Sequence, residues 1–199
     1  SKGLIKGNYI PSIELVDLRQ ILRTRERVVK SRTRTINRIK MLLHQYEIKF
    51  INTGLTKLKL KELRKIELPE NTKYSLNIYL DQLELYTKQS SDLAKRAHLM
   101  ANKSIFSNTY NIIKTVPGIG PIIGALICFE IGDFKRFSSG KKLAAHIGLT
   151  PREFSSGEHI YKGRITGQGN SLLRSYLIEA SWFLIGKDPA MKKYYNRIK

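Results

Sequence analysis

Apolar residues recur every three or four positions through the first part of the chain. From Leu15 to Phe50 they keep a heptad register, which is the pattern of a coiled-coil helix. No glycine or proline interrupts residues 12–50, so we predict a helix of about 35 residues and roughly 50 Å in length. Ser12 follows Pro11 and is suited to cap the N-terminus of this helix.

A second helical pattern runs from Leu76 to Met100, after a lysine-rich connection over residues 54–65. Two consecutive amphipathic helices pack most simply as an antiparallel pair, so we predict a long coiled-coil helical hairpin. Two arginines, Arg25 and Arg32, fall in the apolar seam of the first helix. Because buried polar layers fix register and oligomer state, we expect a homo-oligomer, a dimer or larger, formed through the coiled coil.

After residue 103 the pattern changes to short elements punctuated by glycine. We therefore divide the chain into an arm over residues 1–103 and a compact C-terminal domain over residues 104–199. Ser139 is suited to cap a short helix over residues 140–147, and Asn170 is suited to cap a final helix. Residues 148–159 have no helical period and predict an exposed loop or hairpin. The predicted fold class is mostly α with minor extended structure.

A glycine-rich turn lies between two apolar helical stretches at residues 116–121. Gly118 and Gly120 permit a tight turn, and Pro121 suits the first position of the following helix. The N–H groups at such a helix start can bind an anion. The pattern therefore resembles a helix-hairpin-helix element, which binds the DNA backbone without recognising sequence. A purely structural helical hairpin is the alternative.

Composition limits the partners of the chain. The 199 residues include 36 Lys and Arg against 16 Asp and Glu, a net charge of +20, which predicts a polyanionic partner. The one cysteine, Cys128, excludes a disulfide framework and a thiolate metal cluster, and it favours a reducing compartment. The apolar stretch over residues 119–129 is far shorter than the roughly 20 residues that cross a bilayer, so we expect no membrane partner.

Basic side chains are dense on the first helix outside its apolar seam. No acidic residues of that helix are placed to neutralise them, so we predict a rod that follows a phosphate backbone; a solvated charged face is the alternative. Composition does not choose between RNA and DNA, because both expose the same phosphate charge. These residues are Arg19, Arg23, Arg27, Lys30, Arg34, Arg38 and Lys40.

Two adjacent serines occupy the predicted loop. A hydroxyl is a weak nucleophile unless a base, a positive field or a metal activates it. Ser155 and Ser156 are followed by His159, a conceivable proton acceptor, and cations in the surrounding sequence could stabilise the charge that develops on a phosphorus atom. An ordinary Ser-Ser-Gly turn with an incidental histidine is the alternative. The cations are Arg152, Lys162, Arg164 and Arg174.

A series of motifs over about residues 105–185 resembles the C-terminal domain of the insertion-sequence transposases grouped as families 110, 116 and 902. The arginine-rich helix over residues 18–48 resembles the coiled-coil segment of the same proteins. In chain order the motifs are Val116-Pro-Gly-Ile-Gly-Pro, Arg136-Phe137, Ala144-x-x-x-Gly148-Leu149-x-Pro151, Ser155-Ser156-Gly157, Gly163-Arg164-Ile165 and Gly169-Asn170-x-x-Leu173-Arg174.

The resemblance implies a serine-dependent transposase or recombinase. A loop serine of the family attacks a DNA phosphodiester and forms a transient phosphoserine link. Its motif maps onto Ser156, with Ser155 as the alternative, and Arg152, Arg164 and Arg174 are carried over as phosphate-binding candidates. The family also uses an element-encoded bridge RNA that pairs with donor and target DNA. DNA and a bridge RNA are therefore the expected partners, in the cytoplasm of a bacterial or archaeal cell and associated with the nucleoid.

One part of the family pattern has no counterpart here. The N-terminal half of the family is an RNase-H-like domain with four acidic metal ligands, whereas Glu130, Asp133, Glu158 and Glu179 fall on different predicted elements. We expect this chain to bind no metal or other cofactor by itself, with Mg²⁺ bound only when the acidic domain is present.

The chain opens without Met, and we expect a segment of a longer protein. The alternative function is a non-catalytic module for nucleic-acid binding and oligomerisation.

Overall fold

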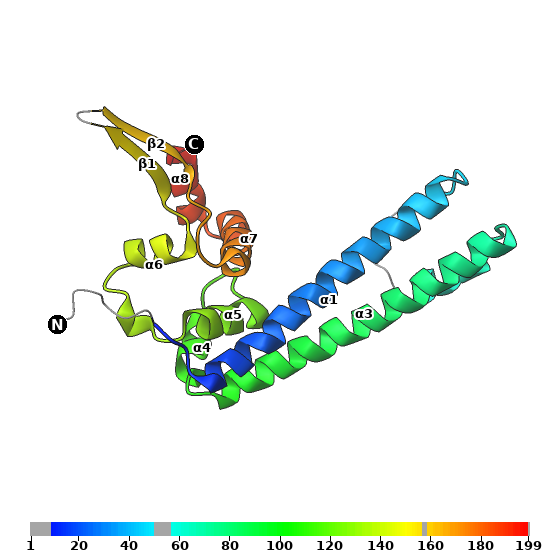
Figure 1. Cartoon of the computed structure of the whole chain (residues 1–199), viewed down its shortest axis with the longest axis horizontal. Coiled ribbons are helices and arrows are strands. Elements are labelled where there is room, and N and C mark those ends of the chain that lie inside the picture. The colour runs from blue at the N-terminus through cyan, green and yellow to red at the C-terminus, as the bar shows by residue number, and fades with distance from the viewer. Residues whose placement is uncertain (1–8, 50–56, 157–158, 199) are drawn as a thin grey trace. The chain divides into compact units, whose positions relative to one another are not determined.

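The computed structural model of the chain describes residues 9–49, 57–156 and 159–198. Within these ranges the fold is mostly helical, with eight α-helices, one short 3-10 helix and a two-stranded antiparallel sheet (Figure 1). The predicted fold class is confirmed. In chain order the elements are α1 (Ile13–His44), α2 (Lys57–Lys65), α3 (Glu70–Lys103), α4 (Ser107–Ile113), α5 (Pro121–Ile131), η1 (Phe134–Arg136), α6 (Gly140–Ile147), β1 (Pro151–Ser156), β2 (His159–Ile165), α7 (Ser171–Lys187) and α8 (Pro189–Ile198).

The chain folds into two compact units. One unit contains residues 21–96, and the other combines the residues before 21 with those from 97 onward. The first turns of α1 and the last turns of α3 thus belong to the unit that also contains α4 to α8. The division of the chain into domains at residues 103 and 104 stays a prediction.

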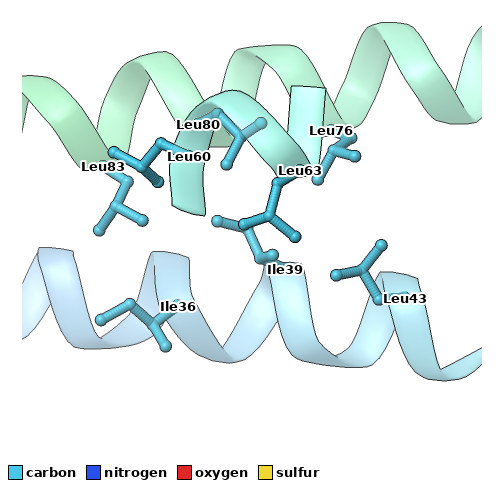
Figure 2. Packing of buried hydrophobic residues seen from close by; sticks show 8 residues of the cluster. All are labelled: Ile36, Ile39, Leu43, Leu60, Leu63, Leu76, Leu80 and Leu83. Carbon is cyan, nitrogen blue, oxygen red and sulfur yellow. The ribbon is translucent and has the colours of Figure 1, made fainter. Parts of the chain in front are cut away.

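The unit of residues 21–96 is built on the long helix pair. Ile36, Ile39 and Leu43 of α1 point toward leucines of α2 and α3 (Figure 2). The predicted connection over residues 54–65 is wrong in part, because residues 57–65 form α2. Leu60 and Leu63 are buried in the core, and the packing of this apolar pair stabilises the helix. The buried residues of this cluster are Ile36, Ile39, Leu43, Leu60, Leu63, Leu76, Leu80 and Leu83.

The predicted first helix is confirmed with a small difference at its end. The Ser12 hydroxyl accepts a hydrogen bond from the Leu15 N–H at 3.2 Å, which is the predicted cap. The helix ends at His44, because Glu47 adopts a positive φ of 58° that a right-handed helix does not contain. The predicted register holds as far as Leu43, since Leu15, Leu22 and Leu43 are buried. Beyond it, Tyr46 is 40% exposed and Phe50 lies outside the described residues.

The other unit is organised around α5. Residues 124–131 are all buried, as expected for a helix that is apolar on every side. Gly124 lets the ring of Tyr110 approach, since a Cβ at this position would lie 3.1 Å from a Tyr110 ring carbon. Cys128 is buried in the same helix, and burial raises the pKa of its thiol to about 12.

The C-terminal end holds one helix more than predicted. The expected final helix is α7, and the Asn170 side chain caps it by accepting from the Leu173 N–H at 3.0 Å. The chain then forms α8, whose N-terminus is capped by Asp188: its carboxylate accepts from the Ala190 N–H at 2.8 Å. Of the helices described, none is long and apolar enough to cross a membrane.

Candidate functional site

The predicted serine loop is an antiparallel hairpin that links α6 to α7 (Figure 1). Its backbone pairs Ser156 with His159, Ser155 with Ile160 and Glu153 with Lys162, with an irregularity between residues 151 and 153. The two serines thus stand at the last two positions of β1, next to the turn. The prediction of a loop or hairpin is confirmed as a hairpin.

The reacting groups proposed from sequence lie at this tip. Gly157 and Glu158 are outside the described residues, and the side chains of Ser155, Ser156 and His159 are outside the described part as well. The roles of Ser156 and Ser155 as nucleophile, and of His159 as proton acceptor, therefore stay predictions. The backbone establishes that both serines and the histidine belong to the same end of one hairpin.

Three of the four predicted cations are exposed on the strands of the hairpin. Arg152, Lys162 and Arg164 are all accessible to solvent, and the Arg152 guanidinium donates to the Thr166 carbonyl oxygen at 3.2 Å. Phe154 and Tyr161, paired across the strands, are also exposed, by 60% and 69%. The hairpin therefore offers positive charge and aromatic rings to a partner in solution.

Arg174 differs from the other three cations. It is half-buried on the first turn of α7, and its Nη1 donates to the Ile147 carbonyl oxygen at 2.7 Å. That carbonyl belongs to the last residue of α6, so Arg174 caps the C-terminal end of one helix from the N-terminal end of another. The structure gives Arg174 a positioning role at the base of the hairpin.

Two glycines let the chain segments at the base of the hairpin approach each other. Gly148 (φ 80°) ends α6, and a Cβ there would overlap the carbonyl oxygen of Gln168. Gly169 (φ 95°) precedes α7, and a Cβ there would overlap the carbonyl oxygen of His146. The Thr166 N–H donates to the Thr150 carbonyl oxygen at 2.8 Å between the same segments. Only glycine fits both positions.

A buried polar cluster fixes the start of α7 against α5. The Asn170 amide donates to the Glu130 carboxylate at 2.7 Å, and the Glu130 residue is only 5% exposed. Arg19 Nε lies 3.7 Å from the same carboxylate oxygen and donates to the Phe129 carbonyl oxygen at 2.7 Å. The prediction that Arg19 belongs to the open basic face is therefore wrong. Its partners lie about 110 positions further along the chain, beyond the range of helix periodicity.

The glycine-rich turn before α5 packs closely against α7. Gly118 has a φ of +90°, and a Cβ there would lie 2.7 Å from the Ala180 carbonyl oxygen. Gly120 is the N-cap of α5 and has no neighbour within 4 Å of an added Cβ. The turn and α7 enclose a groove of about 550 Å³, lined also by Lys114, Glu179 and Phe183. Binding of a phosphate backbone at Gly118 and Gly120 stays a prediction.

The Arg136-Phe137 motif stabilises a neighbouring part of this unit. The Arg136 guanidinium lies 4.2 Å from the ring centre of Tyr9, and its Nη2 lies 3.2 Å from Nε2 of His146. Burial lowers the pKa of His146, and the positive charges of Arg136 and Arg19 lower it further. A neutral imidazole accepts the hydrogen bond from Arg136, whereas an imidazolium could not.

The predicted basic face of the arm is present on α1 in part. Lys30 lies 3.2 Å from the Glu26 carboxylate of the same helix, so the prediction that no acidic residue of this helix neutralises it is wrong. Arg23, Arg27, Arg34 and Arg38 are exposed, within the unit of residues 21–96. Across the described residues, no group of three or more histidine, cysteine, aspartate or glutamate side chains is arranged to hold a metal ion.

Comparison with known proteins adds an independent line of argument. Residues 110–196 match the model of the transposase family IS116/IS110/IS902. The chain is 28% identical over 185 residues to the transposase for insertion sequence element IS1111A of Coxiella burnetii, a match covering 87% of this chain and 48% of that protein. It is 28% identical over 182 residues to a probable family 20 transposase of Pseudomonas aeruginosa, covering 87% and 52%.

A further relative is named for a different process, the inversion of a gene. The pilin gene-inverting protein of Moraxella bovis is 35% identical over 91 residues, which cover 45% of this chain and 28% of that protein. The two transposases above match most of this chain, and the chain spans about half of their length.

Proposed function

Residues 110–196 match the model of the IS116/IS110/IS902 transposase family, and on this premise we propose that the chain is the part of an insertion-sequence transposase that cleaves and transfers DNA strands. Relatives named as transposases over most of the chain support an enzyme that processes DNA. The related pilin gene-inverting protein supports recombination as the general reaction.

The observation that carries this proposal is the hairpin. Its backbone holds Ser155 and Ser156 beside the turn, while Arg152, Lys162 and Arg164 are exposed along the same two strands. The base of the hairpin is fixed by close packing at Gly148 and Gly169. A rigid base, a cationic stem and a hydroxyl near the tip are what a phosphoryl-transfer site requires.

In the proposed reaction, the Ser156 hydroxyl attacks the phosphorus atom of a DNA phosphodiester. The serine Oγ–P bond forms, the bond from phosphorus to one deoxyribose oxygen breaks, and that oxygen takes up a proton as the serine releases its own. The guanidinium groups of Arg152 and Arg164 would stabilise the added negative charge. Reversal by a second DNA hydroxyl transfers the strand and frees the serine.

Consecutive positions of a strand belong to opposite faces of a hairpin. We therefore expect one of the two serines to carry the reaction rather than both interchangeably. We retain Ser156 as the nucleophile and Ser155 as its alternative. His159, paired with Ser156 along the backbone, is the candidate to accept the serine proton.

The proposal also includes partners and setting. Donor and target DNA, a bridge RNA and further copies of the chain are the proposed partners, with the protein acting at the nucleoid in the cytoplasm. We place Mg²⁺ on the acidic RNase-H-like domain implied by the family resemblance. When bound there, the metal would neutralise part of the negative charge on the reacting phosphate.

The test uses the complete transposase with Ser156→Ala, Ser155→Ala and the control Ser91→Ala, an exposed serine of α3. We expect Ser156→Ala to abolish recombination and the covalent protein–DNA adduct formed on a nicked substrate, while Ser91→Ala keeps both. Full recombination by Ser156→Ala and by Ser155→Ala would reject the serine mechanism. It would leave a non-catalytic module for nucleic-acid binding and oligomerisation.

A further inference from the structure

The last two helices expose aromatic rings that the proposed reaction does not use. Trp182 and Phe183 of α7 are 58% and 54% exposed, and Tyr194 of α8 is 50% exposed. With the neighbouring Tyr195, we call these four residues the aromatic platform. Folded proteins gain more from burying rings of this size than from any other side chain, so exposed aromatic surface marks a binding site.

The rings of the aromatic platform are held by contacts between α7 and α8. Trp182 and Tyr195 meet edge to face, with ring centres 5.6 Å apart and planes at 66°. The carboxylate of Asp188 caps α8 by accepting from the N–H groups of Ala190 and Met191, which fixes the turn between the helices. The indole ring is therefore in contact with Tyr195 while Trp182 stays 58% exposed to solvent.

Positive charge surrounds these rings. Lys187 Nζ lies 5.8 Å from the ring centre of Phe183, and the Arg197 guanidinium lies 5.2 Å from that of Tyr194. Lys192 and Lys193 are exposed on α8 between them. The acidic side chains on these two helices and their junction are Asp188, which caps α8, and Glu179, which lines the groove beside Gly118.

We propose that the aromatic platform binds unpaired nucleotides of a nucleic acid, with a base stacked on Trp182 and phosphates held by Lys187, Lys192, Lys193 and Arg197. Aromatic rings interleaved with basic side chains are the general means of holding single strands. The bases of a duplex already stack on one another, so only unpaired nucleotides offer a free face. Lysine is depleted at protein–protein interfaces, which favours nucleic acid over a protein partner.

This inference rests on the proposed function only in taking nucleic acid as the partner, because the aromatic platform does not include the serine hairpin. Unpaired RNA and unpaired DNA share the chemistry of a stacking base and a phosphate. The experiment therefore compares both, together with a duplex and an anionic membrane surface.

Trp182 is the single tryptophan of the chain, so its fluorescence reports on this surface alone. The full chain is titrated with oligouridylate, oligothymidylate, a DNA duplex of the same length, and vesicles of phosphatidylserine and phosphatidylcholine. We expect the two single strands to quench the fluorescence, the stronger ligand identifying RNA or DNA, with little change for the duplex or the vesicles. Absence of quenching by saturating single strands, or equal quenching by duplex or vesicles, overturns the proposal.

Two kinds of substitution separate the contribution of base stacking from that of positive charge. Trp182→Leu is expected to weaken single-strand binding by between about 5-fold and about 150-fold, the range for one stacked base, and Trp182→Phe by less. Tyr74→Leu, at a ring of α3 that is 70% exposed, is the matched control and should bind normally. The dependence of affinity on salt should be unchanged in Trp182→Leu and weaker in Lys192→Gln with Lys193→Gln.

The experiments give different results if the aromatic platform is wrong and if the serine mechanism is wrong. Unchanged single-strand affinity in Trp182→Leu, with serine-dependent recombination intact, overturns the aromatic platform alone. Loss of recombination in Ser156→Ala with normal fluorescence quenching supports both proposals. Circular dichroism melting of each variant confirms that the helices are folded.

Discussion

Asn170 joins two structural roles, and its replacement tests the packing that holds the serine hairpin. The side-chain oxygen caps α7 through Leu173 N–H at 3.0 Å, and the amide donates to the buried Glu130 carboxylate at 2.7 Å. Loss of a cap costs about 1 kcal/mol, and removing a donor from a buried charged acceptor costs about 1 to 3 kcal/mol. We expect Asn170→Ala to lower the free energy of unfolding by about 2 to 4 kcal/mol.

Asn170→Asp separates the two roles. Aspartate keeps the oxygen that caps α7 and adds a negative charge that the helix N-terminus favours. It also replaces the donor to Glu130 with a second acceptor, so the pair can form a hydrogen bond only after taking up a proton. The folded variant then binds a proton that the unfolded chain releases, and its stability falls as the pH rises.

The assay is urea unfolding, monitored by circular dichroism, at about pH 5 and at about pH 8, both above the range where free carboxylates titrate. We expect the deficit of Asn170→Asp, measured against the wild-type chain, to grow between about pH 5 and about pH 8, and that of Asn170→Ala to stay nearly constant. Asn111→Ala, at an exposed position of α4, is the control and should change stability by less than about 0.5 kcal/mol. Wild-type stability of Asn170→Asp at the higher pH would refute the Asn170–Glu130 contact and the argument built on it.

Two further predictions concern His146 and Cys128. The pKa of His146 is lowered by burial and by Arg136 and Arg19. The unfolded chain therefore binds its proton more readily, and this contribution to stability is complete above about pH 6.5 and is lost as the pH falls below it. His146→Gln should flatten the acid limb of a plot of unfolding free energy against pH; a limb identical to that of the wild-type chain would contradict the contact between His146 and Arg136. The raised pKa of Cys128, about 12, predicts that iodoacetamide labels the folded chain at a negligible rate and the chain in urea completely; rapid labelling of the folded chain would disprove its burial.

Local chemistry explains which parts of the fold could be predicted from sequence. The caps at Ser12, Ser139 and Asn170 were predictable because a cap joins a side chain to an N–H three residues away. The long helices followed from heptad spacing, which is also a local property. The helix α2 was missed because its many lysines concealed an apolar pair whose burial requires α1 and α3.

The residues of the candidate site also fall into two groups, those predictable from local sequence and those that depend on distant contacts. The hairpin and its exposed cations were accessible to sequence reasoning, since turn residues and charge are properties of short segments. The partners of Arg19 and Arg174 were not, because these are backbone carbonyls in segments distant along the chain. An arginine that binds a carbonyl and one that awaits a phosphate have the same sequence signature.

The motifs that resemble the transposase family therefore contain two physically different classes of residue. Gly148, Gly169 and Asn170 close the base of the hairpin and fix the start of α7. Arg152 and Arg164 stand exposed on its strands, and the hydrogen bond from the Arg152 guanidinium to the Thr166 carbonyl oxygen is itself exposed to solvent. A buried motif residue is explained by the fold alone, whereas an exposed arginine contributes little to the energy of folding, so the fold gives little reason for arginines on the strands that carry the two serines. The functional argument consequently depends on the exposed class, and substitutions there should alter DNA processing while leaving the unfolding free energy within about 0.5 kcal/mol of the wild-type value.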